Sequence, residues 1–229
     1  MKVMILAAGR GERMGALTQS CPKPLIKVAG KPLLQHHLER LQAAGYGDVV
    51  INVAYLGEQI QQFIHRDFLP SVAGAMNIEI SVESHCLETG GGIHNALPLL
   101  GDQPFAVING DVWTDYPLQQ LPVTLTGLAH LMLVDNPEHN PGGDFSLQGN
   151  GQALNPSGSE AGTALTFSGV SVLNPLLFRG CQSGVFPLAP LLRRAADQGQ
   201  LTAEHYQGIW TDVGTPARLQ AVENSIQEQ

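Results

Sequence analysis

The sequence predicts an α/β fold in which one mixed, doubly wound sheet is covered by helices. Hydrophobic residues make up 43% of a chain of 229 residues, which is enough to bury a sizeable core. In the first half, apolar runs of strand length alternate with segments of helical periodicity. Neither a linker nor an internal repeat divides the chain, so we expect a single Rossmann-like domain over residues 1–229.

The first half provides most of this alternation. Residues 2–8 are almost wholly apolar and predict a buried strand, which is followed by a glycine-rich loop over 9–15. Lys31-Pro32 predicts a helix start with proline in the first turn, and Gly45 predicts its end. The next elements are a strand over 48–54, a helix marked by Leu56, Ile60, Phe63 and Ile64, a strand over 77–83, a helix over 90–100 and a strand over 105–108.

The second half has a looser pattern. Apolar runs predict strands over 125–134 and 163–173. Between them, residues 136–159 are rich in Gly, Pro and Asn, and we expect an extended loop or hairpin that covers the site. A helix is predicted over 186–196. Thr215-Pro216 predicts the start of a last helix, whose apolar positions are Leu219, Val222 and Ile226.

Charge and composition exclude several classes of protein. The formal net charge is −8 and the pI is about 5.4, which argues against a protein that binds nucleic acid through its phosphates. No apolar run has the length of a membrane span, and the one at the N-terminus is too short for a signal peptide. Cys21, Cys86 and Cys181 lack the spacing of a disulfide framework or a zinc site. We therefore expect a cytoplasmic protein that binds neither nucleic acid nor membrane, and we leave its oligomeric state open.

Positive charge is concentrated near the N-terminus. Six of the twelve Lys and Arg residues lie in the first 31 positions, whereas none lies between Arg66 and Arg179. A basic segment in an acidic protein indicates a focused anion site rather than a broad electrostatic face. A solvated basic loop is the alternative, but the glycines among these charges favour an anion site.

Two parts of this basic segment are suited to bind phosphate. Backbone N–H groups in the glycine-rich loop over 9–15 can approach phosphate oxygens, and Arg13 can add a planar guanidinium. Met14 stands where a dinucleotide fingerprint requires glycine, and a tight turn alone would explain the loop equally well. Prolines on both sides of Lys23 stiffen its backbone, which favours a positioned cation over a solvated one.

Two carboxylates are candidates for a metal site. Asp111 follows a buried strand in the sequence Asn109-Gly110-Asp111, and Asp212 lies within Trp-Thr-Asp-Val-Gly-Thr at 210–215. Open α/β sheets bind ligands at the carboxyl ends of their strands. If both carboxylates meet there, they suit Mg²⁺, which takes one or two carboxylates together with substrate phosphates. A turn or helix-capping role for Asp212 is the alternative.

These motifs belong to a longer ordered set. It consists of Leu-Ala-Ala-Gly-x-Gly-x-Arg-Met at 6–14, Pro-Lys-Pro-Leu at 22–25, Gly-Lys-Pro-Leu-Leu at 30–34, Leu-Glu-Thr-Gly-Gly-Gly at 87–92, Asn-Gly-Asp at 109–111, Phe-Ser-Gly at 167–169 and the segment 210–215. The set covers almost the whole chain and resembles the sugar-1-phosphate nucleotidylyltransferases. Within that family, the short length and the stretch at 88–93 look most like the enzymes that use UTP and N-acetylmuramate 1-phosphate in peptidoglycan recycling.

The resemblance implies a nucleotidyltransferase (GT-A-like) fold, with a nucleotide-binding half over 1–112 and a sugar-binding half over 113–229. It implies that UMP passes from UTP to the sugar phosphate, with Mg²⁺ as cofactor and with Lys23, Arg13 and Asp111 as catalytic residues. Asp111 and Asp212 would hold the metal. The nucleotide-binding positions that the resemblance implies are Leu6, Ala7, Ala8, Gly9, Arg10, Gly11, Glu12, Arg13, Lys23, Glu83 and Gly90.

The acceptor half departs from the family. Many members have Glu-Lys-Pro in the acceptor loop, whereas here Glu160 is followed by Ala161 and no Lys or Arg is near in the sequence. By resemblance Glu160 would bind sugar hydroxyls, and the phosphate charge would be met by Mg²⁺, Lys23 or backbone amides. Further candidates for sugar binding are Asn109, Gly143 and Asp144.

Two alternative functions are retained. The same chemistry could serve another base or sugar, as in a mannose-1-phosphate guanylyltransferase, because Glu83 could accept a hydrogen bond from guanine as well as from uracil. A regulatory subunit that binds nucleotide without catalysis is the second. It predicts the loss of metal or phosphate ligands, and Arg13, Lys23, Asp111 and Asp212 are all present.

Overall fold

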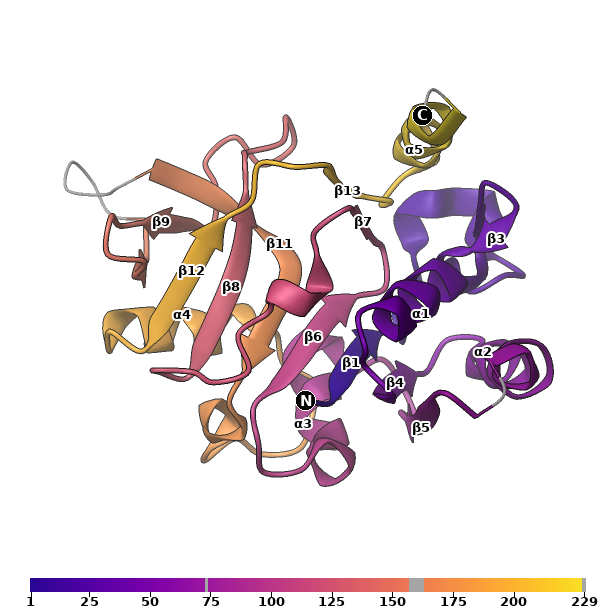
Figure 1. The fold of residues 1–229 in the computed structure, drawn as a ribbon, viewed down its shortest axis with the longest axis horizontal. Helices are drawn as coiled ribbons and strands as arrows, with labels where there is room; N and C mark the ends of the chain where they lie inside the picture. The colour runs from indigo at the N-terminus through magenta and orange to yellow at the C-terminus, as the bar shows by residue number, and fades with distance from the viewer. Residues whose placement is uncertain (73, 157–162, 228–229) are drawn as a thin grey trace.

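A computed structural model describes residues 1–72, 74–156 and 163–227, and within these ranges the fold is built on a nine-stranded mixed sheet (Figure 1). The main path of the sheet has the order β10-β9-β11-β6-β1-β4-β5, while β8 pairs with β11 and β12 pairs with β8. Its strands are β1 (Val3–Leu6), β4 (Asp48–Val53), β5 (Asn77–Val82), β6 (Phe105–Asn109), β8 (Ala129–Val134), β9 (Phe145–Leu147), β10 (Ala153–Leu154), β11 (Thr163–Leu173) and β12 (Leu201–His205).

Strand β1 shows how the apolar runs generate two cores. Successive side chains of a strand point to opposite faces of the sheet. Val3 and Ile5 therefore pack in one core, with helices α1 (Leu33–Ala43) and α2 (Gly57–Gln62), whereas Met4 packs in the other. The second core contains α3 (Glu88–Leu100) and α4 (Ala189–Asp197), so helices cover both faces. This arrangement confirms the predicted mixed α/β fold.

The parallel part of the sheet brings four strand ends together. Strand β1 pairs in parallel with β4 and β6, and β4 pairs in parallel with β5. The loops that follow these strands therefore meet at one edge. Strand β11 runs antiparallel to β6 and β8, and its pairing with β8 shifts register between Phe167 and Ser171.

Several boundaries differ from the prediction. Lys31-Pro32 lies in strand β3 (Lys31–Pro32), paired with β2 (Lys27–Val28), and α1 begins one residue later because Pro32 is extended. The strand predicted over 125–134 begins at Ala129, and the helix predicted over 186–196 begins at Ala189. Further elements that were not predicted are β12 and the small sheet of β7 (Val112–Thr114) with β13 (Trp210–Asp212).

The loop or hairpin predicted over 136–159 is present in its described part, where β9 and β10 form an antiparallel hairpin, but this hairpin extends the sheet and does not cover the site. Strands β9 and β10 extend the sheet beside β11, because backbone groups of β9 pair with those of β11. From this segment, His139 approaches the predicted metal ligand Asp212, with its Nε2 3.5 Å from Asp212 Oδ1. Residues 157–159 lie outside the described ranges.

The last helix packs against the first half of the chain. Helix α5 (Pro216–Gln227) begins after Thr215, whose Oγ1 accepts a hydrogen bond from the Arg218 N–H at 3.3 Å, so the predicted cap is confirmed. A small apolar core of Val28, Leu33, Val213 and Val222 joins it to β2 and α1. In the described ranges, no helix is long and apolar enough to cross a membrane.

Short turns complete the described part of the chain. They comprise 3-10 turns at Glu12–Thr18, Lys23–Leu25, Leu69–Val72, Leu118–Gln120 and Pro175–Phe178, and a π-turn at Phe63–Phe68.

Candidate active site

A cleft of about 990 Å³ lies at the carboxyl ends of β1, β4, β5 and β6. Its walls come from residues 6–13, 83–89 and 109–111, together with Lys23, Pro24, Asn52, Ala54, Tyr55 and Gly214. All the predicted nucleotide-binding positions except Gly90 line this cleft. Its size is in the upper part of the range for small-molecule sites, so it can accept a nucleotide-sized ligand.

The glycine-rich loop packs directly on Lys23. Gly11 has φ +65°, and a Cβ there would lie 3.1 Å from the Cβ of Lys23 and 3.1 Å from Thr18 Cγ2. Glycine thus provides both the left-handed backbone and the close approach. Arg10 lies over the ring of Tyr55, with its Cζ 5.6 Å from the ring centroid. The loop therefore contacts the walls of the cleft at two points, Gly11 on Lys23 and Arg10 on Tyr55.

Lys23 is held in a defined position. Its Nζ is 2.6 Å from Asp111 Oδ2, and its side chain is only 12% exposed. Pro22 before it is extended, and Pro24 after it is buried in the 3-10 turn. The two prolines restrict the backbone, and the ion pair orients the ammonium toward the cleft. The sequence prediction of a positioned cation is consistent with this geometry.

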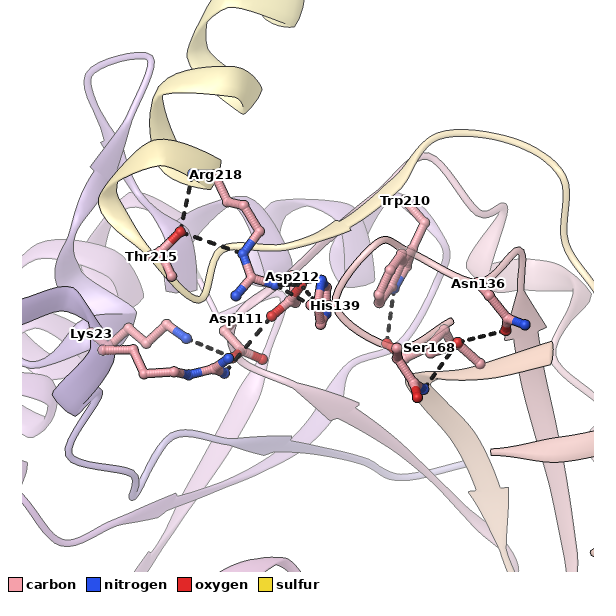
Figure 2. Close-up of polar contacts among 12 residues, drawn as sticks. Lys23, Asp111, Asn136, His139, Ser168, Trp210, Asp212, Thr215 and Arg218 are labelled. Atoms are coloured by element: carbon pink, nitrogen blue, oxygen red, sulfur yellow. Dashed lines mark hydrogen bonds and ion pairs between the residues drawn. The ribbon is translucent and has the colours of Figure 1, made fainter. Parts of the chain in front are cut away.

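Asp111 directly precedes β7, and Asp212 is the last residue of β13, the strand that pairs with β7. Asp212 pairs in register with Val112, and the Val213 N–H donates to the Asp111 carbonyl at 2.7 Å. Figure 2 shows the two carboxylates close to each other, with Lys23 beside Asp111. The two acidic motifs, about 100 positions apart in sequence, therefore meet at one edge of the cleft.

Asp212 is surrounded by two arginines and a histidine. Arg218 Nη1 donates to its Oδ1, Arg13 Nη2 lies 3.9 Å from its Oδ2, and His139 Nε2 lies 3.5 Å from its Oδ1. Figure 2 shows Arg218 and His139 meeting at this carboxylate. Sequence reasoning missed both residues, because His139 lies in a loop and Arg218 lies on a helix 79 positions further along the chain.

The donor set fits a magnesium ion that is shared with a substrate. Two carboxylates lie together, and in the described part of the chain no group of three His, Cys, Asp or Glu residues could hold a metal ion by itself. Mg²⁺ uses one or two carboxylates and completes its coordination with water and substrate phosphates. The arrangement thus suits Mg²⁺ better than a structural zinc ion, which needs four protein ligands.

A buried hydrogen-bond network fixes the far wall of the cleft. Asn52 Oδ1 accepts from the Ala7 N–H at 2.8 Å, and Asn52 Nδ2 donates to Glu83 Oε1 at 2.7 Å. Glu83 Oε2 accepts from the Leu87 N–H at 3.0 Å. Glu83 is therefore buried rather than exposed at a strand end. Sequence reasoning missed Asn52, for which a single amide in the apolar run 48–54 was the available signal.

Comparison with known proteins agrees with this architecture. The family model described as "Nucleotidyl transferase" matches residues 2–127, which is more than half of the chain. The chain belongs to this nucleotidyltransferase family. It is 49% identical over 226 residues to the N-acetylmuramate alpha-1-phosphate uridylyltransferase of Neisseria meningitidis serogroup B, covering 96% of this chain and 95% of the relative.

Two further proteins are similar over nearly their whole length. The N-acetylmuramate alpha-1-phosphate uridylyltransferase of Caulobacter vibrioides is 34% identical over 236 residues, with 98% of this chain and 96% of the relative covered. The crystal structure of a putative glucose-1-phosphate thymidylyltransferase from Bacillus anthracis superposes with a TM-score of 0.82 at 18% identity, covering 100% of this chain and 96% of that one. At this identity, the structural match shows the fold alone.

In this nucleotidyltransferase, three successive glycines of α3 each face a different neighbour. A Cβ on Gly90 would lie 2.6 Å from the Phe186 ring, one on Gly91 would lie 2.2 Å from the Gly184 carbonyl oxygen, and one on Gly92 would lie 2.7 Å from Glu83 Oε1. Gly90 thus packs against the loop before α4 and does not line the cleft. The prediction that it contacts the nucleotide is not supported by its position.

The predicted sugar-binding residues separate into three groups. Asn109 lines the cleft and packs against Gly169. A Cβ at position 169 would lie only 2.6 Å from Asn109 Nδ2, so this position requires glycine. Asp144 Oδ2 instead accepts from the Phe167 N–H at 2.9 Å, beside the irregularity of β11, and Gly143 adjoins it outside the cleft. Glu160 lies outside the described residues.

The Phe-Ser-Gly and Trp-Thr-Asp motifs of this nucleotidyltransferase contact each other. Trp210 Nε1 donates to the Ser168 carbonyl at 2.9 Å, and Ser168 Oγ donates to the Met132 carbonyl at 2.6 Å. These bonds tie β13 to the irregular part of β11 (Figure 2). The position of Asp212 therefore depends on both motifs.

A buried histidine lies under the Asp111 turn. His37 on α1 is 4% exposed, and its Nε2 is buried without a hydrogen-bond partner in the described part of the chain. The pKa of His37 is lowered to about 4, chiefly by burial and also by the nearby Arg40, while a backbone hydrogen bond with Gly110 opposes the shift. The imidazole is therefore neutral at physiological pH.

Proposed function

We propose that this nucleotidyltransferase transfers UMP from UTP to N-acetylmuramate 1-phosphate, forming UDP-N-acetylmuramate and pyrophosphate. An oxygen of the sugar phosphate would attack the α-phosphorus of UTP, and the bond to the bridging oxygen of the β-phosphate would break. The observation that supports this most is the cleft where Lys23 and Arg13 lie beside Asp111 and Asp212. The names and full-length similarity of the two uridylyltransferase relatives support the choice of substrates.

The chain supplies positioning and charge rather than a general base. A phosphate monoester is largely ionised near neutral pH, because its second pKa is about 6, so its oxygen needs no deprotonation. Backbone N–H groups of residues 9–13 would bind the triphosphate, and Arg13 would bind the departing pyrophosphate. Lys23 would stabilise the charge that develops at the α-phosphate. Since Lys23 is already oriented by Asp111, little reorganisation is needed at the moment of reaction.

Asp111 and Asp212 would hold Mg²⁺. When bound, the ion would neutralise phosphate charge and orient the two substrates. Both carboxylates are now paired with cationic side chains, Asp111 with Lys23 and Asp212 with Arg218.

The remaining contacts concern the base and the sugar. Ala8 and Glu83 line the cleft, and an oxygen of Glu83 could accept the uracil N3–H in addition to its existing bonds, because a carboxylate oxygen has two lone pairs. Of the predicted sugar-binding residues that the structure describes, Asn109 is the one that lines the cleft, and we propose that it contacts the sugar. We propose that the reaction takes place in the cytoplasm as part of peptidoglycan recycling.

Pyrophosphate release tests this proposal. The purified protein would be assayed with Mg²⁺, four nucleoside triphosphates and a panel of sugar 1-phosphates that includes N-acetylmuramate, N-acetylglucosamine and mannose. The fastest release is expected with UTP and N-acetylmuramate 1-phosphate, with much slower release for the other sugar 1-phosphates. Release with GTP and mannose 1-phosphate would keep the chemistry and change the substrates. Nucleotide binding without release for any pair would favour a regulatory subunit.

A further inference from the structure

The proposed acceptor carries two anionic groups, a phosphate and the carboxylate of its lactyl ether. Both need positive partners when they leave water, because an unpaired buried charge is costly. Yet no Lys or Arg lies between Arg66 and Arg179, so most of the acceptor half provides no such side chain. Any cation for the acceptor must therefore reach the site from another part of the chain.

Arg218 reaches the site from the last helix. It lies in the first turn of α5, and the core around Val222 fixes that helix on β2 and α1. Its Nη1 donates to Asp212 Oδ1, and its Nε lies 3.4 Å from Thr215 Oγ1. His139, from the acceptor half, lies 3.1 Å from the same Nη1. The guanidinium is thus oriented by three side chains (Figure 2).

Gly214 connects this guanidinium with the cleft, of which it forms part of the wall. A Cβ on Gly214 would lie 2.7 Å from Asp212 Oδ2, 2.9 Å from Arg218 Nη2 and 3.1 Å from Arg13 Nη2. Glycine is therefore what allows these three groups to converge. Two guanidinium groups face one carboxylate, so the cluster has an excess of positive charge.

The geometry leaves Arg218 able to bind a further anion. A guanidinium has five N–H donors in a planar fork that matches carboxylate and phosphate oxygens. Its hydrogen bonds to Thr215, Asp212 and His139 use Nε and Nη1, whereas Nη2 lies next to Gly214, and the side chain is 21% exposed. A purely structural ion pair with Asp212 would need neither the second arginine nor a glycine in the cleft wall.

From this arrangement we infer that Arg218 binds an anionic oxygen of the acceptor, on its phosphate or on its lactyl carboxylate, with His139 and Thr215 positioning the guanidinium. The inference rests on the proposed function and adds the acceptor's cationic partner to it. Arg13, from the phosphate-binding loop, would serve the nucleotide side of the same cluster. The charge that the acceptor loop lacks is thus supplied by the last helix.

Steady-state kinetics of Arg218→Gln and Arg218→Lys test this inference. Loss of a charge-assisted hydrogen bond should raise the KM for N-acetylmuramate 1-phosphate about 10- to 100-fold in Arg218→Gln, with the KM for UTP unchanged. Arg218→Lys should recover part of the loss, because it keeps the charge without the fork. Arg66→Gln, at an exposed position outside the site, is the matched control and should leave both KM values unchanged.

Two acceptors identify which oxygen is bound. N-acetylglucosamine 1-phosphate has the phosphate but lacks the lactyl carboxylate. If Arg218 binds the carboxylate, Arg218→Gln loses activity only with the muramate, and the preference for the muramate disappears. If Arg218 binds the phosphate, catalytic efficiency falls by the same factor with both acceptors. Either pattern supports the inference.

Binding measurements separate a role in acceptor binding from an indirect effect through Asp212. Calorimetric titration of N-acetylmuramate 1-phosphate into the protein with a non-hydrolysable UTP analogue should show weaker acceptor binding in Arg218→Gln. The apparent Mg²⁺ constant and the affinity for the analogue should stay at the wild-type values. Unchanged acceptor affinity, or activity restored by excess Mg²⁺, would overturn the inference.

Failure of the proposed function gives a different result. In that case the wild-type protein itself releases no pyrophosphate with UTP and the muramate. If the wild type is active and Arg218→Gln matches it in acceptor KM and acceptor affinity, only the role of Arg218 is wrong.

Discussion

Lys23 and Asp111 are 88 positions apart in the sequence, yet their charged atoms lie 2.6 Å apart. The sequence identified both residues, because Lys23 lies between two prolines and Asp111 follows the buried strand over 105–108. Their pairing could not be predicted, since it depends on how the 3-10 turn at Lys23 folds across the end of β6. The same is true of Asp212 and Arg218, whose contact requires the turn into α5.

Replacing Asp111 by asparagine should lower turnover by about 100-fold or more. A neutral amide is a poor Mg²⁺ ligand, and the change also removes the partner that orients Lys23. The measurement is kcat with UTP and N-acetylmuramate 1-phosphate at saturating and limiting Mg²⁺. Asp102→Asn, at an exposed loop position, is the control and should retain activity. Near-normal turnover of Asp111→Asn at limiting Mg²⁺ would remove Asp111 from the metal site.

His37 should make stability depend on mildly acidic pH. Burial lowers its pKa from the ordinary 6.5 to about 4, so below pH 6.5 the unfolded chain binds a proton that the folded protein excludes. The stability that the protein has while His37 is neutral in both states is therefore fully present above pH 6.5, and it is lost as the pH falls toward 4. The difference between the two pKa values corresponds to a loss of about 3 kcal/mol in the free energy of unfolding.

Denaturant unfolding at pH 7 and pH 4.5 checks the role of His37. The free energy of unfolding should fall less over this interval in His37→Gln than in the wild type. His65→Gln, at an exposed position, should behave like the wild type. Equal pH dependence in His37→Gln and the wild type would show that His37 does not titrate between folded and unfolded states as inferred.

At the scale of elements, α3 is a helix despite three consecutive glycines. Each glycine costs a helix about 1 kcal/mol relative to alanine, so propensity alone disfavours this sequence. The structure explains the triplet through its close approach to Glu83 just before the helix and to Gly184 and Phe186, which are more than 90 positions away in sequence. Sequence predicted the helix from its later apolar residues, but the reason for the glycines depends on tertiary contacts.

Gly91→Ala should therefore destabilise the protein by about 1–3 kcal/mol, although alanine is the better helix former. The added Cβ would lie 2.2 Å from the Gly184 carbonyl oxygen, so one backbone segment must move. Thermal or denaturant unfolding measures the effect. Gly47→Ala is the control, because its Cβ would meet only the Ala75 carbonyl at an ordinary 3.6 Å. If Gly91→Ala were as stable as the control, the close packing of α3 on the 184–188 loop would be incorrect.

The strands differ in how far sequence could predict them. β11 has the predicted bounds Thr163–Leu173, because its long apolar run is buried between β6 and its other neighbours. β12 was missed, since Leu201–His205 is short and mixes polar with apolar residues. It becomes a strand only through parallel pairing with β8, which is a long-range contact. Propensity over five residues cannot indicate such a pairing.

At the scale of the whole molecule, the parallel and antiparallel parts of the sheet position different sides of the site. The parallel strands β1, β4, β5 and β6 present the loops that line the cleft, and this part was predictable from alternating strand and helix patterns. The antiparallel part and α5 bring His139 and Arg218 to Asp212 from the other side. The order of motifs predicted the fold and most of the cleft, whereas the acceptor side depends on tertiary packing of the C-terminal helix.

Nucleotide binding should therefore stabilise the whole molecule even when no acceptor is present. A ligand that binds only the folded state adds about 2.7 kcal/mol at 100 times its Kd, which corresponds to about 5–10 °C in Tm for a chain of this size. UTP with Mg²⁺ should produce such a shift in thermal unfolding. Lys23→Ala should reduce it, because one cation of the cleft is lost, whereas Arg218→Gln should retain it if Arg218 serves the acceptor. An equal shift in Lys23→Ala and the wild type would contradict a triphosphate contact at Lys23. A reduced shift in Arg218→Gln would instead assign this arginine to the nucleotide.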